Sequence, residues 1–218
     1  MSGRVPVWDL PSRLFHWALV GCVVFAWWSG EEGDFDAHSW TGYSILVLVL
    51  FRIMWGFVGS RHSRFADFLV GPGRVISYLR GEVQPGPGHN PLGGWSVAVM
   101  LLLLLLQGVS GLFNTDDVLF NGPFYYAASG EFRDAMGVVH EVTFNLLTAF
   151  ILLHVAAVLF YQLRRRQPLL QSMLRGSAEG KEGRATPAPR WLALVIVVLL
   201  ALALWAAINV APQPESLW

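Results

Sequence analysis

Long apolar runs alternate with short polar segments along this chain, and this pattern sets its architecture. The runs lie at about residues 14–28, 40–58, 95–113, 139–163 and 191–210. Each is close to the ~20 residues that a helix needs to cross the hydrocarbon layer of a bilayer. The first is short, but residues 10–30 are long enough if Arg13 and His16 lie near one interface. Because the runs show no two-residue alternation, they predict helices, and thus an all-α integral membrane protein.

The polar connectors divide these runs into a core and an added helix. Residues 1–173 contain the first four runs and predict a four-helix transmembrane bundle. Residues 174–190 form a polar linker, and residues 191–211 predict a fifth, C-terminal transmembrane helix without histidine or internal charge. Residues 64–81, between the second and third runs, contain Phe, Leu and Tyr together with several Arg residues. This composition is typical of a segment that lies in the membrane interface.

Composition agrees with a membrane protein and limits its chemistry. Hydrophobic residues make up 54% of the chain and charged residues 14%, whereas a soluble domain has about a quarter charged residues. The single cysteine, Cys22, excludes a disulfide within the chain, a cysteine-bound cluster and c-type haem attachment. We expect Cys22 to be a packing residue. The first run leads into WWSGEEGDFD without a cleavage site of small residues, which predicts a retained helix rather than a signal peptide.

The basic residues predict the orientation. With the N-terminus in the cytoplasm, 13 of the 15 Lys and Arg residues fall on the inside, Arg52 lies within a helix, and Arg133 alone lies outside. The outside loops are acidic instead, with Glu31, Glu32, Asp34, Asp36, Asp116, Asp117, Glu131 and Asp134. Because basic residues favour the cytoplasmic side, we predict a multi-pass protein of a bacterial inner membrane, with a cytoplasmic N-terminus and a periplasmic C-terminus.

Four of the six histidines lie in or at the ends of predicted helices, where ionisable side chains are costly and indicate function. His140 and His154 are 14 residues apart on one helix, which separates them by about 21 Å and returns the side chain to within about 40° of the same face. His38 begins the second helix at the depth of His140, and His16 lies near the depth of His154. Since haem iron accepts two axial imidazoles, the pairs His38 with His140 and His16 with His154 predict two bis-histidine b-type haems.

Two arginines belong to this arrangement. Arg52 follows His38 by 14 residues, so it lies on nearly the same face at the depth of the inner pair. A haem propionate is one candidate partner for this buried cation, and an ion pair with another side chain is the alternative. Arg13, three residues before His16, offers the same contact from the interface. A zinc site is excluded, because its three or four ligands must converge at one point.

The remaining histidines fall in predicted cytoplasmic connectors. We expect His62, in GSRHSRF, to face solvent or lipid headgroups. We expect His89, in GHNP, to be a loop residue that caps the third helix, with a place near a quinone or a redox partner as the alternative.

Four segments carry the motifs of a known family. They are VWDLPSRLFHW, HSWTGYSILVLVLFRIMWGFVGSRHSRFADF, GHNPLGGWSV and VVHEVTFNLLTAFILLHV, within about residues 5–173. Together they resemble the prokaryotic cytochrome b561 family, which includes the b-type cytochrome subunits of nickel-iron hydrogenases. The resemblance implies a four-helix core with two b haems bound by histidines of the first, second and fourth helices, at positions that are His16, His38, His140 and His154 here.

The leading interpretation is therefore a dihaem electron carrier, acting as the cytochrome subunit of an oxidoreductase system rather than as a stand-alone enzyme. Its partners would be the lipid bilayer, quinone and a periplasmic c-type cytochrome or hydrogenase-like metalloenzyme subunit, and not nucleic acid. One alternative is a superoxide-to-quinone oxidoreductase, which the acidic outer loops disfavour because only Arg133 attracts an anion. Another is a haem-free membrane anchor or metal transporter.

Overall fold

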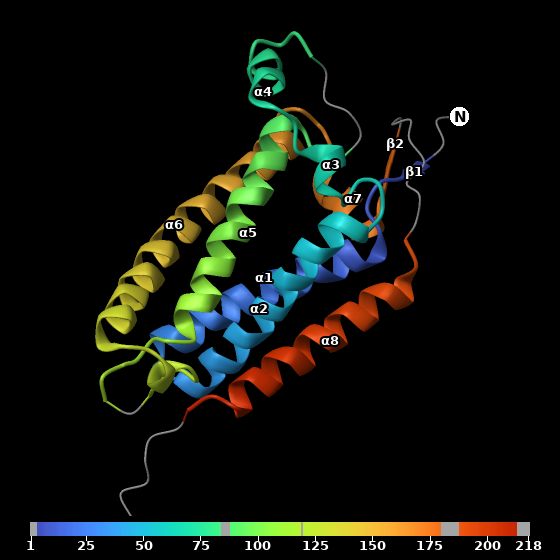
Figure 1. The fold of residues 1–218 in the computed structure, drawn as a ribbon. Coiled ribbons are helices and arrows are strands. Elements are labelled where there is room, and N and C mark those ends of the chain that lie inside the picture. Colours follow the sequence, from blue (N-terminus) through green and yellow to red (C-terminus); the bar gives the residue numbers. More distant parts are fainter. Residues whose placement is uncertain (1–3, 84–87, 119, 180–187, 213–218) are drawn as a thin grey trace, which may run out of the picture.

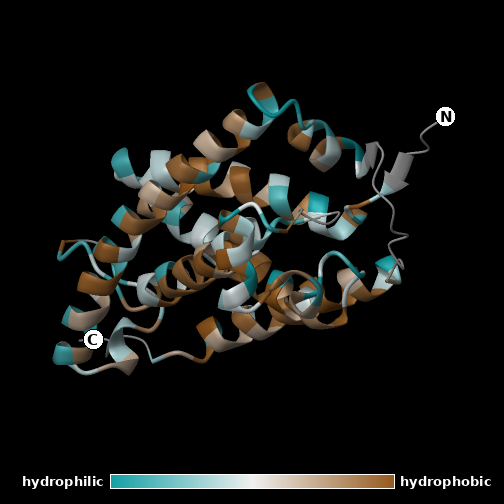
Figure 2. Ribbon diagram, turned by 90° about the horizontal axis from the view of Figure 1, so that it is seen from above, coloured by the Kyte–Doolittle hydropathy of each residue, from teal (hydrophilic) through white to brown (hydrophobic). Residues whose placement is uncertain are grey.

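Five long helices dominate the computed structural model, which describes residues 4–83, 88–118, 120–179 and 188–212 (Figure 1). They are α1 (Leu10–Glu31), α2 (Phe35–Val58), α5 (Pro91–Gly111), α6 (Gly130–Leu163) and α8 (Arg190–Asn209). Each is long and apolar enough to cross a membrane. Figure 2 shows hydrophobic residues along these helices and hydrophilic ones mainly in the connections. The predicted helical membrane architecture is confirmed, and the five helices match the five apolar runs.

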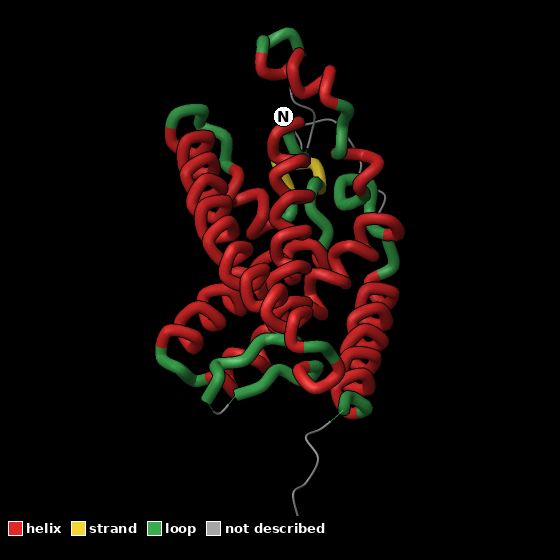
Figure 3. Tube along the Cα trace, turned by 60° about the vertical axis from the view of Figure 1, so that its left-hand side comes forward, coloured by secondary structure: helices red, strands yellow, loops and turns green. Residues whose placement is uncertain are grey.

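Short elements complete the structure at the helix ends. They are α3 (Phe65–Phe68), α4 (Pro72–Leu79), the 3-10 turn η1 (Tyr125–Ala127), α7 (Leu169–Arg175) and the strands β1 (Arg4–Pro6) and β2 (Ser177–Glu179). Figure 3 shows the connections gathered at the two ends of the long helices. The two three-residue strands β1 and β2 pair antiparallel beside the helices and leave the all-α fold class unchanged. They form because two extended segments meet there and satisfy each other's backbone groups.

The helices pack as two antiparallel pairs. Helix α1 packs on α2, and α5 packs on α6, while α2 and α5 join the pairs. Helix α8 runs along α2, where Ala193 and Ile196 enter the same buried cluster as Phe15, Val49 and Trp55 (Figure 1). The fifth helix is thus packed on the four-helix core. The polar linker at residues 174–190 gave no indication of this packing. Residues 180–187 of that linker lie outside the described residues.

Polar caps decide where the long helices begin, and several begin earlier than hydropathy predicts. The side chain of Asp9 accepts from Ser12 N at 2.7 Å, and that of Asp34 accepts from Ala37 N at 3.1 Å. Such caps satisfy backbone N–H groups that the first helical turn leaves unpaired. Helix α6 begins at Gly130 rather than at about residue 139. His140 consequently lies well inside this helix. The apolar run had placed it at the start of the helix instead.

Candidate functional site

His38 of α2 and His140 of α6 face each other across the bundle. Their ring centroids are 6.3 Å apart and the ring planes are inclined by 72°. Two imidazoles on opposite sides of one metal ion, each with its nitrogen about 2 Å from the metal, have ring centres about 6 Å apart. The structure therefore brings together the first pair that the sequence predicts. The separation of the ring centres suits two imidazoles that bind one metal ion from opposite sides.

Backbone carbonyls orient both rings of this pair. Nδ1 of His38 lies 2.8 Å from the carbonyl oxygen of Ala26, and Nδ1 of His140 lies 3.1 Å from that of Gln107. Because a carbonyl only accepts, each Nδ1 carries the proton and donates it. The lone pair then lies on Nε2, the atom that binds a metal in such an arrangement.

Gln107 holds the free nitrogen of His140 in this structure. Its amide Nε2 lies 3.0 Å from His140 Nε2 and donates to it, while its Oε1 accepts from Thr143 Oγ1. A metal held by His140 Nε2 would compete with this amide for the same lone pair. Sequence reasoning missed Gln107, because one polar residue in the apolar run of α5 carries no motif.

Two glycines let these rings approach the neighbouring helices. A Cβ on Gly30 of α1 would lie 3.0 Å from His38 Nδ1, and one on Gly111 of α5 would lie 3.1 Å from His140 Cε1. These separations are tighter than ordinary van der Waals contact. Glycine within a helix costs about 1 kcal/mol relative to alanine, so its presence in these apolar runs was an available signal of close approach that the sequence analysis did not use.

His16 of α1 and His154 of α6 form the second pair. They lie close enough to interact electrostatically. Nδ1 of His16 is buried and has no hydrogen-bond partner among the described residues. A buried polar atom without a partner costs about 1–3 kcal/mol, and among the described residues this Nδ1 lacks the carbonyl partner that the Nδ1 atoms of His38 and His140 have. The ring also meets Trp17 edge-on, with centroids 5.0 Å apart.

Both predicted arginines lie near this second pair's end of the bundle. Arg52 is only 5% exposed, and its guanidinium carbon lies 5.6 Å from the Phe65 ring centroid and 5.7 Å from that of Phe68. Its Nη1 is buried without a hydrogen-bond partner among the described residues. Arg13 donates from Nη1 to the carbonyl of Leu174 at 3.1 Å. Its buried Nε has no hydrogen-bond partner among the described residues.

The two connector histidines lie inside the fold. His62 is 8% exposed, so the expectation that it faces solvent or headgroups is wrong. His89 packs against the rings of Trp8 and Phe68, each with its centroid 4.7 Å away. Burial, followed by the nearby charge of Arg52, lowers the pKa of His89 to about 3, so it is neutral at physiological pH. A Cβ built on Gly88 would lie 3.5 Å from His62 Nδ1, so the backbone next to His89 lies close to His62.

These features define a multi-pass helical membrane protein with paired imidazoles inside the bundle. The sequence profile of the family described as prokaryotic cytochrome b561 matches residues 7–176, so the chain belongs to that family. This confirms the resemblance, and it makes the chain a b-type cytochrome of membrane electron transport, whose cofactor is haem b. The first pair fits that cofactor, because both Nδ1 atoms donate to backbone carbonyls and each lone pair lies on Nε2.

Several relatives share most of their length with this chain. A protein of Bradyrhizobium diazoefficiens is 23% identical over 218 residues, covering 82% of this chain and 87% of its own. One of Azotobacter vinelandii is 26% identical over 225 residues, covering 83% and 90%. Each is named "Probable Ni/Fe-hydrogenase B-type cytochrome subunit". A 24% identical protein of Escherichia coli K12, covering 82% and 92%, carries the corresponding name for hydrogenase 1.

Proposed function

We propose that this chain carries electrons across a bacterial inner membrane on two b haems. His38 and His140 would hold one haem, and His16 and His154 the other. The observation that carries the proposal is the first pair, with ring centres 6.3 Å apart and both Nδ1 atoms donating to backbone carbonyls. The second pair adds two imidazoles in electrostatic contact, one with an unpartnered buried nitrogen.

In this account the protein orients and insulates the cofactor. Haem would supply a one-electron redox centre, and a histidine pair holding its iron would favour electron transfer over oxygen binding. The carbonyls of Ala26 and Gln107 hold the imidazoles in one tautomer and one orientation. Arg52 and Arg13 would offset the charge of the propionates at the second pair, where each has an unpartnered buried nitrogen. Electron transfer of this kind requires no side chain to act as general acid, general base or nucleophile.

The distribution of charge supports an orientation and a type of partner. With Lys and Arg favouring the cytoplasm, the N-terminus would be cytoplasmic, the C-terminus periplasmic, and the pair of His38 and His140 would lie near the periplasm. Electrons would then pass between the quinone pool and a periplasmic redox protein. The relatives' names favour a nickel-iron hydrogenase as that protein, and a c-type cytochrome is the second candidate.

The superoxide alternative gains no support from the outer segments. Arg133, the basic residue predicted there, stacks its guanidinium carbon 4.0 Å from the Tyr125 ring centroid and donates to the Tyr125 carbonyl at 3.3 Å. Its contacts are thus local and do not form an open anion pocket.

Transfer across the membrane can be measured with the purified protein in lipid vesicles that contain trapped ferricyanide. A short-chain quinol added outside is expected to reduce the trapped ferricyanide in wild-type vesicles. His154→Ala is expected to abolish this reduction, since one redox centre of the path is lost, while the haem at His38 and His140 remains visible. Wild-type vesicles whose haem is reduced while the trapped ferricyanide stays oxidised would contradict the proposal.

A further inference from the structure

Three nitrogen-bearing side chains meet at the end of α2, and each keeps one buried nitrogen without a hydrogen-bond partner among the described residues. These atoms are Arg52 Nη1, His62 Nε2 and His89 Nδ1. Arg52, His62 and also His154 act electrostatically on His89, so the set adjoins the second histidine pair. We call these three residues the His89 cluster. Buried polar groups are normally paired, so three unpaired nitrogens in one place indicate a missing ligand.

Asp67 acts electrostatically on His62 but pairs with Arg64, and no carboxylate of the described residues is hydrogen-bonded to the three unpaired nitrogens. Arg52 is within electrostatic reach of Asp9. The carboxylate of Asp9 is already saturated, because it accepts from Trp55 Nε1 at 2.9 Å, from Ser63 Oγ at 3.1 Å, from Ser60 Oγ and from Ser12 N. A buried guanidinium without a hydrogen-bonded counter-charge is costly. The ligand that completes the cluster should therefore bring negative charge.

The chemistry of the cluster fits a carboxylate. Arg offers a fork of N–H donors that matches two carboxylate oxygens, and each histidine offers a ring N–H. Helix α5 begins at Pro91, two residues after His89, so the positive end of its dipole lies at the same place. The rings of Trp8 and Phe68 flank His89 and limit access of water. A quinone carbonyl accepts hydrogen bonds but brings no charge to offset the guanidinium.

From this juxtaposition we infer that the His89 cluster binds the propionate carboxylates of the haem held by His16 and His154. The inference rests on the proposed function and adds His89 and His62 to the residues that hold that haem. Arg52 follows His38 by 14 residues, about 21 Å along α2, which is the level expected of the second pair. His89 then acts as a positioning and charge-setting residue, and not as an axial ligand.

Redox titration of the visible spectrum tests this assignment. Removing a donor leaves propionate charge less compensated, which stabilises ferric haem and lowers its potential. Arg52→Gln is expected to lower the reduction equilibrium constant of one haem by roughly tenfold, or about 59 mV for a one-electron couple. His89→Leu should lower the same constant by roughly threefold, a shift of about 30 mV on that scale. His89→Gln, which keeps an N–H donor, should restore the wild-type value.

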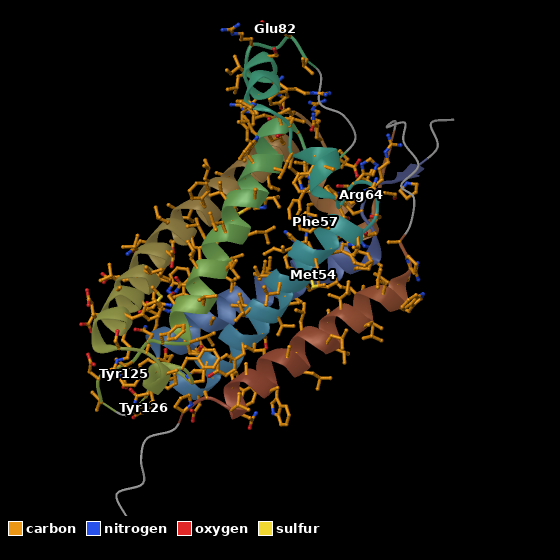
Figure 4. The ribbon with its side chains drawn as sticks, in the orientation of Figure 1. Met54, Phe57, Arg64, Glu82, Tyr125 and Tyr126 are labelled. Atoms are coloured by element: carbon orange, nitrogen blue, oxygen red, sulfur yellow. The ribbon has the colours of Figure 1, made fainter. Side chains whose placement is uncertain are left out.

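Controls separate the possible outcomes. The affected haem must be the one that His16→Ala removes, while the haem of His38 and His140 keeps its potential and reports correct folding. Arg64→Gln removes an exposed cation that pairs with Asp67 at 2.8 Å at this end of the molecule (Figure 4), and it should shift neither haem.

Failure of the inference is distinguishable from failure of the proposed function. Wild-type protein without a b-type spectrum would end both. Two haems with unchanged potentials in Arg52→Gln and His89→Leu would overturn the inference and leave the proposed function standing. If reduction by quinol also fell in these variants, the cluster would face quinone, and the inference would again be overturned. If His89→Leu loses the haem, retention at wild-type potential in His89→Gln supports the inference, and loss in both variants overturns it.

Discussion

His38→Ala is expected to remove one haem from each chain and to leave the other in place, and His16→Ala is expected to remove the other haem. Each change deletes one axial imidazole of one pair, and a b haem is held by its axial ligands and surrounding contacts without a covalent bond. The two pairs lie about 21 Å apart, so loss at one should leave the other intact. Redox-titrated visible spectra of the purified variants should each keep about half of the wild-type b-type absorbance, with different potentials.

A matched control uses the neighbouring residue. Ser39 follows His38 in the same turn, and its hydroxyl donates to the carbonyl of Phe35 in its own helix at 2.6 Å. Ser39→Ala should therefore retain both haems. Loss of the same spectral component in His38→Ala and His16→Ala would be incompatible with two separate haem sites.

Asp9→Ala is expected to lower the stability of the protein strongly. Asp9 caps α1 and accepts from Trp55 Nε1 and two serine hydroxyls, so it ties the start of α1 to the end of α2. Hydrogen bonds to charged groups contribute about 1.5–3 kcal/mol, and the buried donors left unpaired add to the cost. We expect the free energy of unfolding to fall by about 3 kcal/mol, measured by denaturation in detergent.

Asp34→Ala provides the comparison for Asp9. Asp34 also caps a long helix, but its hydrogen bond from Ala37 N, at 3.1 Å, is exposed. Its loss should cost about 1 kcal/mol, the usual value of a cap. Equal losses in the two variants would show that Asp9 acts only as a cap and does not hold α1 on α2.

The contribution of Asp9 should also depend on pH. Burial raises the pKa of Asp9, but hydrogen bonds from Ser12, Ser60 and Trp55 outweigh it and hold the pKa below its ordinary value. A carboxylate with a depressed folded pKa contributes its full stability above its unfolded pKa of about 3.9, and loses it as pH falls through the folded pKa. The difference between wild type and Asp9→Ala should therefore be constant above about pH 5 and shrink below about pH 4.

Hydropathy and helical geometry predicted much of this structure. The apolar runs predicted all five long helices, and the 14-residue spacing of His140 and His154 indicated the two histidine pairs. The rings of His38 and His140 do lie together. These features were predictable because the thickness of the bilayer sets the length of a transmembrane helix. The fixed rise per residue then gives the depth of each side chain in the membrane.

The remaining features depend on contacts between distant parts of the chain. The early start of α6 at Gly130 follows from the cap at Ser129, which hydropathy does not detect. His62 is buried, although the polar residues around it in the sequence indicated exposure. Gly30 is informative only once the ring that lies against it is known.

The central claim is that two imidazole pairs each hold one haem. Its most direct test is a potentiometric titration of the purified wild-type protein, combined with a measurement of haem per polypeptide. The account predicts two b haems per chain, reduced in two one-electron steps of equal amplitude. A single haem per chain, or none, would contradict it.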